Sequence, residues 1–323
     1  MLAAIFEHGQ VTVQEKEIPS PGPKEALVRV HLAGVCNTDL EILAGYVPFT
    51  GTLGHEFVGR VVQALEHPEL VGQRVVADIN CGCGHCPWCL QKNHRHCMQR
   101  KVLGIRGLDG AFAHYIQVPV ANLYPVPDQI PDEDAVFAEP LAAALEIGQQ
   151  VHITVQTRVA VLGDGKLGLL CALALSLYSP RLRLFGRHPA KLHIASAQGI
   201  ATCCLWSGQI PGPEDTGFDL VVDCTGQAQG IDTALDLVRP EGTVVLKTTS
   251  TDPSTVNMSR VVVNEMSLLG SRCGDMGLAV HFLAHRWISV QPLIHKVFPL
   301  SSTPMALDQA GQKGALKVLI DCR

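Results

Sequence analysis

The chain has 323 residues, which is enough for two domains with separate hydrophobic cores. Hydrophobic residues make up 47% of it and charged residues 17%, a composition that excludes a mainly disordered protein. The formal net charge is −5 and like charges do not cluster, so neither nucleic acid nor a membrane surface is expected as a partner. The longest near-apolar stretch, 167–178, falls short of the roughly 20 residues that cross a bilayer. The N-terminal residues lack the pattern of a signal peptide, and we expect a cytoplasmic location.

Short β segments separated by Gly and Pro occupy the first 130 residues and predict an antiparallel, barrel-like region. The expected strands are 10–18, 25–32, 57–64, 73–79 and 113–118. From 132 to 150 the chain is rich in Ala, Leu and Glu, which predicts helices that lead out of the β region.

Strand and helix patterns alternate between residues 158 and 269. The expected strands are 158–162, 181–185, 220–223, 243–247 and 267–269, and the expected helices between them are 166–178, 189–198 and 231–238. This alternation predicts a parallel sheet. A further helix, 278–287, and a last β segment, 316–320, follow.

A glycine-rich turn joins the first of these strands to its helix. Its pattern is Gly-x-Gly-x-x-Gly, formed by Gly163, Gly165 and Gly168. The first glycine permits a tight turn, the second lets the backbone approach a pyrophosphate, and the third allows the helix to pack closely on the strand. The helix N-terminus then offers N–H donors to the anion. In this setting the motif predicts a dinucleotide site, although a tight turn without a ligand has the same pattern.

The second strand of the parallel sheet ends at Gly186 and Arg187. An acidic residue usually stands near this place and accepts hydrogen bonds from the adenosine ribose of NAD. Here Gly186 leaves room for a 2′-phosphate, and the Arg187 guanidinium can pair with it. We therefore predict NADP(H) as the preferred cofactor, with NAD(H) as the alternative.

The chain contains 12 cysteines, and their clustering favours metal binding over disulfides. Residues 81–97 form a short lobe with the spacing Cys-x2-Cys-x2-Cys-x7-Cys. Four thiolates would complete the shell of a structural zinc ion and leave no position for substrate. An iron–sulfur cluster is the alternative, but its ferredoxin run places the fourth cysteine at x3. The expected ligands are Cys83, Cys86, Cys89 and Cys97.

A second group of possible ligands is scattered along the chain. A single cysteine or histidine is more often packed than functional, so each residue is ordinary by itself. Their combination with the other motifs favours a catalytic metal site. The group consists of Cys36, Thr38, Asp39, His55, Glu56 and Glu139.

Taken together, these motifs resemble the zinc-dependent medium-chain dehydrogenase/reductase superfamily, which includes alcohol, sorbitol and threonine dehydrogenases. The resemblance covers essentially the whole chain and also rests on residues 109–115, 218–226 and 270–272. It implies a GroES-like β-barrel catalytic domain, residues 1–146 and 276–323, that carries the cysteine lobe at 81–97. A Rossmann domain with a doubly wound parallel sheet, residues 147–275, would be inserted between the two parts.

The resemblance also implies roles for individual residues. Cys36 and His55 would bind the catalytic zinc, and Glu139 would be the third ligand. Glu56 is the alternative third ligand. Asp39 would orient the His55 imidazole, and the neighbouring Thr38 would pass a proton from the substrate oxygen. The residues expected to contact the cofactor are Gly163, Asp164, Gly165, Lys166, Leu167, Gly168, Gly186, Arg187, Thr225 and Gly226.

The resulting hypothesis is an NAD(P)-dependent zinc alcohol dehydrogenase with two zinc ions per chain. It would transfer hydride between the nicotinamide and an alcohol or polyol, or the corresponding aldehyde or ketone, with zinc lowering the pKa of the bound alcohol. The alternatives are a zinc-independent quinone or enoyl reductase and a non-catalytic protein that binds zinc and a nucleotide. Members of the superfamily pair through the last strand of the Rossmann sheet, so a homodimer or homotetramer is expected.

Overall fold

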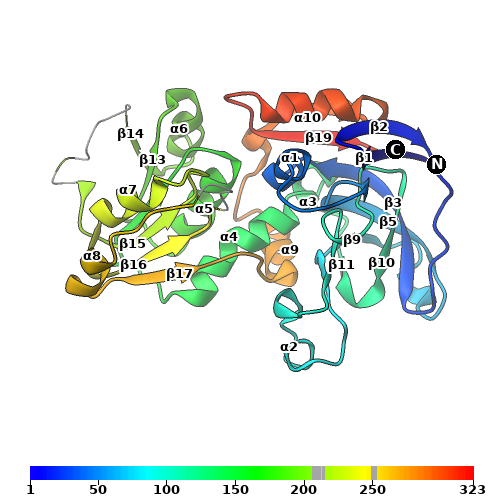
Figure 1. Ribbon diagram of the computed structural model, residues 1–323, viewed down its shortest axis with the longest axis horizontal. Coiled ribbons are helices and arrows are strands. Elements are labelled where there is room, and N and C mark those ends of the chain that lie inside the picture. The colour runs from blue at the N-terminus through cyan, green and yellow to red at the C-terminus, as the bar shows by residue number, and fades with distance from the viewer. Residues whose placement is uncertain (206–211, 213–214, 249–252) are drawn as a thin grey trace. The chain divides into compact units, whose positions relative to one another are not determined.

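The computed structural model describes residues 1–205, 212, 215–248 and 253–323. The chain forms two compact units, one of Met1–Glu139 with Met276–Arg323 and the other of Pro140–Asp275 (Figure 1). The division falls inside helix α4 (Ala138–Gln150), earlier than the domain boundary expected after residue 146. Within the described ranges, no helix is long and apolar enough to cross a membrane.

The first unit is built on a seven-stranded sheet with the order β11-β6-β5-β3-β19-β18, in which β10 also pairs with β3. β19 pairs antiparallel with β3, so a C-terminal strand completes a sheet that N-terminal strands begin. The strands of this sheet are β3 (Glu25–Gly34), β5 (Glu56–Ala64), β6 (Arg74–Ala77), β10 (Tyr115–Pro119), β11 (Leu123–Pro125), β18 (Ile294–Pro299) and β19 (Lys317–Asp321).

Two small sheets and several helices complete the first unit. One sheet has the order β2-β1-β4 and the other β7-β8-β9. Their strands are β1 (Leu2–Glu7), β2 (Gln10–Glu15), β4 (Gly51–Thr52), β7 (Asn80–Cys81), β8 (Lys101–Leu103) and β9 (Gly107–Leu108). The helices are α1 (Asn37–Leu43), α2 (Pro87–Leu90), α3 (Asp132–Ala135), α9 (Met276–Ala284) and α10 (Thr303–Gly311).

The strands β3 and β5 are buried along much of their length because their sequences are rich in apolar residues. Arg29 and Arg60 are exposed and face each other across the pair. Gly59 pairs with Val30, and a Cβ at position 59 would come within 2.7 Å of Val28 Cγ1. The last glycine of the Gly-His-Glu-x-x-Gly segment therefore allows the two strands to pack closely at this point.

The second unit contains a six-stranded parallel sheet with the order β14-β13-β12-β15-β16-β17. This is the strand order of a doubly wound Rossmann domain, in which the order reverses between the first and fourth strands. The strands are β12 (Val159–Leu162), β13 (Leu182–Gly186), β14 (Ala201–Cys204), β15 (Phe218–Asp223), β16 (Val238–Leu246) and β17 (Ser267–Gly270). The helices that follow α4 are α5 (Lys166–Ser176), α6 (Pro189–Ser196), α7 (Gly230–Leu237) and α8 (Met258–Val263).

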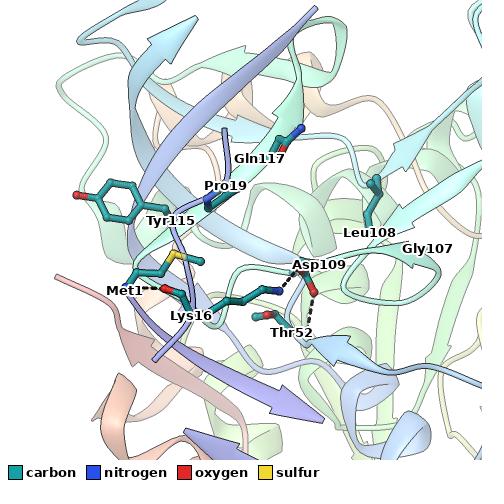
Figure 2. A pocket seen from close by; sticks show the side chains of 10 residues that line it. Met1, Lys16, Pro19, Thr52, Gly107, Leu108, Asp109, Tyr115 and Gln117 are labelled. Atoms are coloured by element: carbon teal, nitrogen blue, oxygen red, sulfur yellow. Dashed lines mark hydrogen bonds and ion pairs between the residues drawn. The ribbon is translucent and has the colours of Figure 1, made fainter. Parts of the chain in front are cut away.

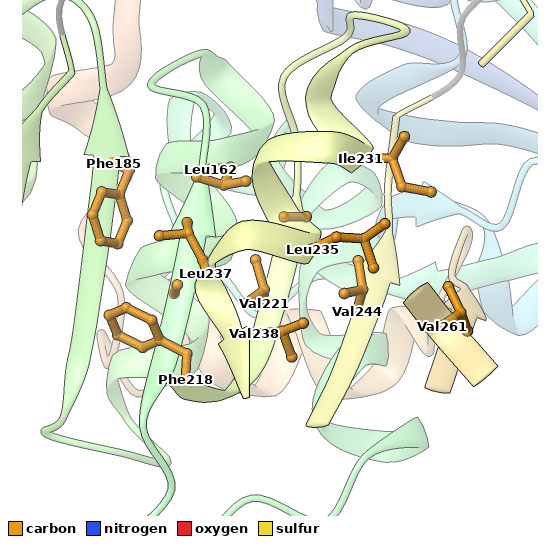
Figure 3. Close-up of a cluster of buried hydrophobic side chains, with 12 residues drawn as sticks. Leu162, Phe185, Phe218, Val221, Ile231, Leu235, Leu237, Val238, Val244 and Val261 are labelled. Atoms are coloured by element: carbon orange, nitrogen blue, oxygen red, sulfur yellow. The ribbon is translucent and has the colours of Figure 1, made fainter. Parts of the chain in front are cut away.

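A cluster of buried apolar side chains lies between this sheet and α7 (Figure 3). Ile231 and Leu235 recur at helical spacing, so one face of α7 is apolar. Phe185 and Phe218 meet edge to face with their ring centroids 5.7 Å apart. Burial of a side chain of this size contributes about 1.5–3 kcal/mol, so the cluster holds α7 on the sheet.

Most of the expected strands and helices are present with shifted ends. The expected helical stretch 132–150 is two helices, α3 and α4, and the expected strand 10–18 ends at Glu15. The hydrophobic pattern does not predict β1, β14, β18, α1, α8 or α10. These elements are short and lack a clear period; β18, for example, fully buries only Phe298.

Candidate metal centres and dinucleotide site

Three of the expected site residues converge in the first unit. Cys36 precedes α1, Glu56 begins β5, and His55 directly precedes that strand. One ligand atom from each of these three side chains lies within 4.8 Å of the other two. His55 and Glu56 are buried, whereas Cys36 is partly exposed. A thiol, an imidazole and a carboxylate, drawn from two segments, therefore share one small volume.

Asp39 connects two of these residues. Its carboxylate accepts a hydrogen bond from the Cys36 backbone N–H through Oδ2, at 2.8 Å, and thereby caps α1. Its Oδ1 lies 3.3 Å from His55 Nδ1, and the Asp39 side chain is fully buried. Burial alone would lower the pKa of His55, but the charges of Asp39 and Cys36 outweigh it and hold this pKa well above its usual value. The site thus favours a positive charge.

Glu56 makes a buried ion pair with Lys317 from β19. The pair occupies Glu56 Oε2, whereas Oε1 of the same carboxylate is buried and has no hydrogen-bond partner among the described residues. A buried unpaired carboxylate oxygen is costly unless a cation binds it. Oε1 is therefore suited to be a metal ligand.

Glu139, the third ligand expected from the resemblance, is not part of this three-residue set. It is nevertheless close enough to interact electrostatically with His55, Glu56 and Lys317. Burial raises the pKa of Glu139 to about 7, with the positive charge of His55 acting in the opposite direction. Glu139 therefore adds a second carboxyl group to the surroundings of the site.

The remaining expected residue of this site is Thr38, in the first turn of α1. Its Oγ1 lies 3.8 Å from Cys36 Sγ. This places a hydroxyl group, which can both donate and accept a proton, beside the Cys36 thiol.

The four expected cysteines of the lobe also converge. The sulfur atoms of Cys83, Cys86, Cys89 and Cys97 lie within 4.8 Å of one another, and all four thiols are free. The Cys83 backbone N–H donates to Cys97 Sγ at 3.5 Å, and backbone N–H groups lower the pKa of Cys83 to about 6. Cys81 is not in the set; its Sγ lies 3.8 Å from Ile79 O, and burial raises its pKa to about 12. Four thiols in this arrangement fit a closed, structural zinc site.

The glycine-rich turn lies between β12 and α5 in the second unit. Gly163 has φ = +104°, which favours glycine, and a Cβ there would come within 2.6 Å of Cys224 O. Gly165 is the N-cap of α5 and has no side chain to cap the helix, and no atom of the described residues lies within 4 Å of where its Cβ would project. The turn leads directly into the start of α5, at Lys166 and Leu167, and a helix N-terminus after a glycine-rich turn is where a pyrophosphate binds in this fold.

The expected contacts from the end of β15 lie beside this turn, since Cys224 directly follows that strand. The Thr225 backbone N–H donates to Asp223 Oδ1 at 2.9 Å, and the Gly226 N–H donates to Thr248 Oγ1 at 3.0 Å. These bonds fix the loop after β15 at the carboxyl edge of the sheet, where ligands of doubly wound folds bind.

A pocket of about 260 Å³ lies elsewhere in the first unit (Figure 2). Lys16 and Asp109 form an ion pair in it, and Asp109 also accepts a hydrogen bond from the Thr52 N–H at 2.8 Å. None of the expected site residues is among the described residues that line this pocket. The Met1 ammonium in this pocket donates to Lys16 O at 2.7 Å. The pocket is therefore not part of the candidate site.

Comparison with known proteins shows the family to which the chain belongs. Residues 22–128 match the family described as "Alcohol dehydrogenase GroES-like domain", and residues 188–290 match "Zinc-binding dehydrogenase". The starvation-sensing protein RspB of Escherichia coli (strain K12) is 30% identical, over 98% of this chain and 97% of RspB. The chain belongs to the zinc-dependent medium-chain dehydrogenase/reductase superfamily. Its GroES-like β unit and Rossmann unit are the fold expected from the sequence.

Two further members of the superfamily are similar along nearly their whole length. A sorbitol dehydrogenase of Halalkalibacterium halodurans is 27% identical and covers 97% of this chain and 96% of its own. A structure from Sinorhizobium meliloti 1021, solved bound to NADP, has a TM-score of 0.92 and 30% identity and covers 99% and 98% of the two chains. As a member of this superfamily, the chain is an oxidoreductase of the zinc-binding dehydrogenase type.

Two contacts at these sites were not expected from the motifs. Lys317 lies 261 positions from its partner Glu56, and the only signal for it is a cation inside the apolar segment 316–320. In the second contact, the Asp164 carboxylate accepts hydrogen bonds from the backbone N–H groups of Arg187 and His188. These bonds join the glycine-rich turn to the end of β13. No pattern in the sequence links those residues.

Proposed function

We propose that this chain is a zinc-dependent oxidoreductase that transfers hydride between a nicotinamide dinucleotide and an alcohol or polyol, or the matching aldehyde or ketone. The convergence of Cys36, His55 and Glu56 supports this most directly. Three donors of sulfur, nitrogen and oxygen suit zinc and leave a fourth position for a substrate oxygen. The open turn at Gly165 supplies the place for the pyrophosphate of the cofactor.

In this proposal Cys36 and His55 hold the catalytic zinc, and Glu56 is the third ligand through its unpaired Oε1. Glu139, the ligand that the resemblance implies, then contributes charge. The zinc content of the variants Glu56→Gln and Glu139→Gln distinguishes the two carboxylates. The substitution that lowers the zinc content of the catalytic site identifies the ligand. The cysteine lobe would hold the second zinc ion of the chain.

When bound, the zinc ion would supply Lewis-acid polarisation of the substrate oxygen, and the nicotinamide would accept or donate the hydride. Asp39 holds the His55 ring with Nδ1 directed at its carboxylate, which leaves Nε2 as the ligand atom. The Asp39 bond to the Cys36 N–H fixes the thiol at the start of α1. Thr38 Oγ1, beside that thiol, takes the alcohol proton and passes it outward.

The test is a spectrophotometric screen of alcohols, polyols, aldehydes and ketones with both nicotinamide cofactors, performed on the chain and on Cys36→Ser. We expect substrate-dependent cofactor turnover that Cys36→Ser abolishes while its thermal unfolding stays that of the parent chain. Cys204→Ser is the matched control, because this thiol lies at the end of β14 in the other unit, and it should retain activity. Activity that survives Cys36→Ser would refute the proposal.

Zinc stoichiometry separates this function from the two alternatives. Two zinc ions per chain support the alcohol dehydrogenase. One ion, held by the cysteine lobe, supports a zinc-independent reductase or a non-catalytic binding protein. The cofactor-coupled screen then distinguishes those two.

The NADP(H) preference expected from Gly186 and Arg187 stays a prediction, with NAD(H) as the alternative. Asp164 brings a carboxylate to the end of β13, which favours the alternative.

We also propose that the chain forms a homodimer or a homotetramer through β17. This strand is at the edge of the parallel sheet, and its Leu268 and Leu269 are only half-buried. An apolar edge strand is usually covered or paired. Light scattering of the purified chain tests this, and a monomeric mass would refute it.

A further inference from the structure

The carboxylate of Asp164 in the glycine-rich turn reaches the end of the neighbouring strand β13. Its Oδ2 accepts hydrogen bonds from the backbone N–H groups of Arg187 at 2.7 Å and of His188 at 2.6 Å. The His188 ring adds a contact from Nδ1 to Oδ1 at 3.0 Å. Asp164 is only 7% exposed. Its position is therefore fixed by three donors that follow β13.

The same carboxylate fills the space above Gly186, the last residue of β13. A Cβ at position 186 would lie within 2.5 Å of both Cβ and Oδ2 of Asp164. In dinucleotide-binding folds the acid that accepts hydrogen bonds from the adenosine ribose comes from the end of this second strand. Here glycine stands at the strand end, and the acidic group arrives from the turn.

The donors bound by Asp164 are those that a 2′-phosphate at this place would use. Consecutive backbone N–H groups form an anion-binding nest, and those of Arg187 and His188 are already directed at the Asp164 carboxylate. A phosphate could reach them only by displacing a negatively charged side chain. The Arg187 guanidinium alone therefore does not determine which cofactor fits.

The carboxylate of Asp164 is negatively charged at neutral pH. Burial alone would raise its pKa, but the hydrogen bonds from His188 and Arg187 outweigh this and lower it. A carboxylate oxygen can accept two hydrogen bonds, and the His188 ring is the one donor to Oδ1 among the described residues. Oδ1 can therefore accept a further bond from a ribose hydroxyl.

We propose that Asp164 is the residue that determines cofactor specificity, and that it selects the free adenosine ribose of NAD(H) against the 2′-phosphate of NADP(H). The inference rests on the proposed dinucleotide site and reverses the preference that Gly186 and Arg187 predict. Asp164 accepts a ribose hydroxyl through Oδ1 and repels a 2′-phosphate by its charge.

Equilibrium binding measures this without any turnover. Isothermal titration of the zinc-loaded chain with NAD+ and NADP+, and with ADP-ribose and its 2′-phosphate, gives the ratio of dissociation constants. We expect the unphosphorylated ligands to bind about tenfold more tightly or better, the effect of one partly screened charge pair. Asp164→Asn keeps the shape and an acceptor oxygen but removes the charge. It should lower the preference, defined as the dissociation constant of the 2′-phosphorylated ligand divided by that of the unphosphorylated ligand, about tenfold.

Asp219→Asn is the matched control. Asp219 is also a hydrogen-bonded carboxylate of the second unit, but it lies near the start of β15 and contacts Arg158 and Arg239. It changes the net charge equally and should leave the ratio unchanged. A parent chain that binds the 2′-phosphorylated ligands more tightly overturns the inference, whether or not the variant folds. A ratio unchanged in Asp164→Asn also overturns it, whereas a parent chain that binds none of these ligands refutes the dinucleotide site itself.

Discussion

Replacing Lys317 by Met would leave Glu56 buried without its counter-charge. The two side chains are 3% and 1% exposed, so water cannot take the place of the lost partner. Removal of one member of a buried ion pair costs about 3–5 kcal/mol. Because small domains are stable by only about 5–15 kcal/mol, Lys317→Met should be among the most destabilising single substitutions in the first unit.

The assay is urea unfolding of the parent chain, Lys317→Met, Glu56→Gln and the double variant, each with zinc removed by a chelator. Glu56→Gln removes the buried charge, so Lys317→Met should cost much less in that background, with a coupling of about 2–3 kcal/mol. Lys313→Met is the control: Lys313 is exposed, and its loss should change stability by no more than about 0.5 kcal/mol. If Glu56 is a zinc ligand, added zinc should reduce the loss of unfolding free energy that Lys317→Met causes.

The pH dependence of this effect follows from the direction of the pKa shift. Burial would lower the pKa of Lys317, but the charges of Glu56 and Cys36 and the bond to Glu56 raise it overall. Stability from the pair is therefore fully present below the usual value of 10.5 and is lost as the pH rises through the folded-state pKa. A cost below about 1 kcal/mol at pH 7, or an equal cost in the Glu56→Gln background, would show that the pair does not stabilise the unit.

Three other outcomes are expected. Gly165→Ala should lower the free energy of unfolding by about 1 kcal/mol or less, since the Gly165 φ of −75° suits alanine. It should nevertheless weaken dinucleotide binding at least about tenfold in a titration. Unchanged binding would contradict the assigned site. Cys97→Ser should lower the zinc content by one ion per chain and make the lobe sensitive to protease, and two retained ions would exclude Cys97 as a ligand. Asp132→Asn should cost about 1–3 kcal/mol at pH 7. Burial would raise the pKa of Asp132, but its partners His31 and Arg74 lower it overall. In urea unfolding, the difference in unfolding free energy between the parent chain and Asp132→Asn should therefore disappear as the pH falls below the usual 3.8 and through the folded-state pKa. A difference that stays constant with pH would contradict this.

The sequence predicts the second unit better than the first. Gly163 has a positive φ, and Gly168 has no room for a Cβ, so these two positions require glycine. The alternation of strands and helices then leads to the observed sheet. The four cysteines of the lobe are also predictable, because local spacing alone brings their sulfur atoms together.

Contacts between distant residues could not be predicted in this way. The choice between Glu56 and Glu139 depends on how β5 and β19 pack with the residues around Glu139, and the partner of Glu56 comes from a distant part of the sequence. The same holds for Asp164, which the motif identifies only as a variable position. The Asp164 side chain is positioned by hydrogen bonds from backbone N–H groups. Because every residue except proline has such a group, the sequence does not indicate which residues will donate.

The position of β19 has a consequence for biosynthesis. The second unit is one continuous stretch, Pro140–Asp275, and can fold as it leaves the ribosome, whereas β3 must wait for β19 to be translated before that edge is paired. Until then Glu56 lacks its partner Lys317. A nascent chain arrested before Lys317 would therefore hold a folded Rossmann unit beside an incomplete barrel, which is the kind of intermediate that chaperones and proteases bind.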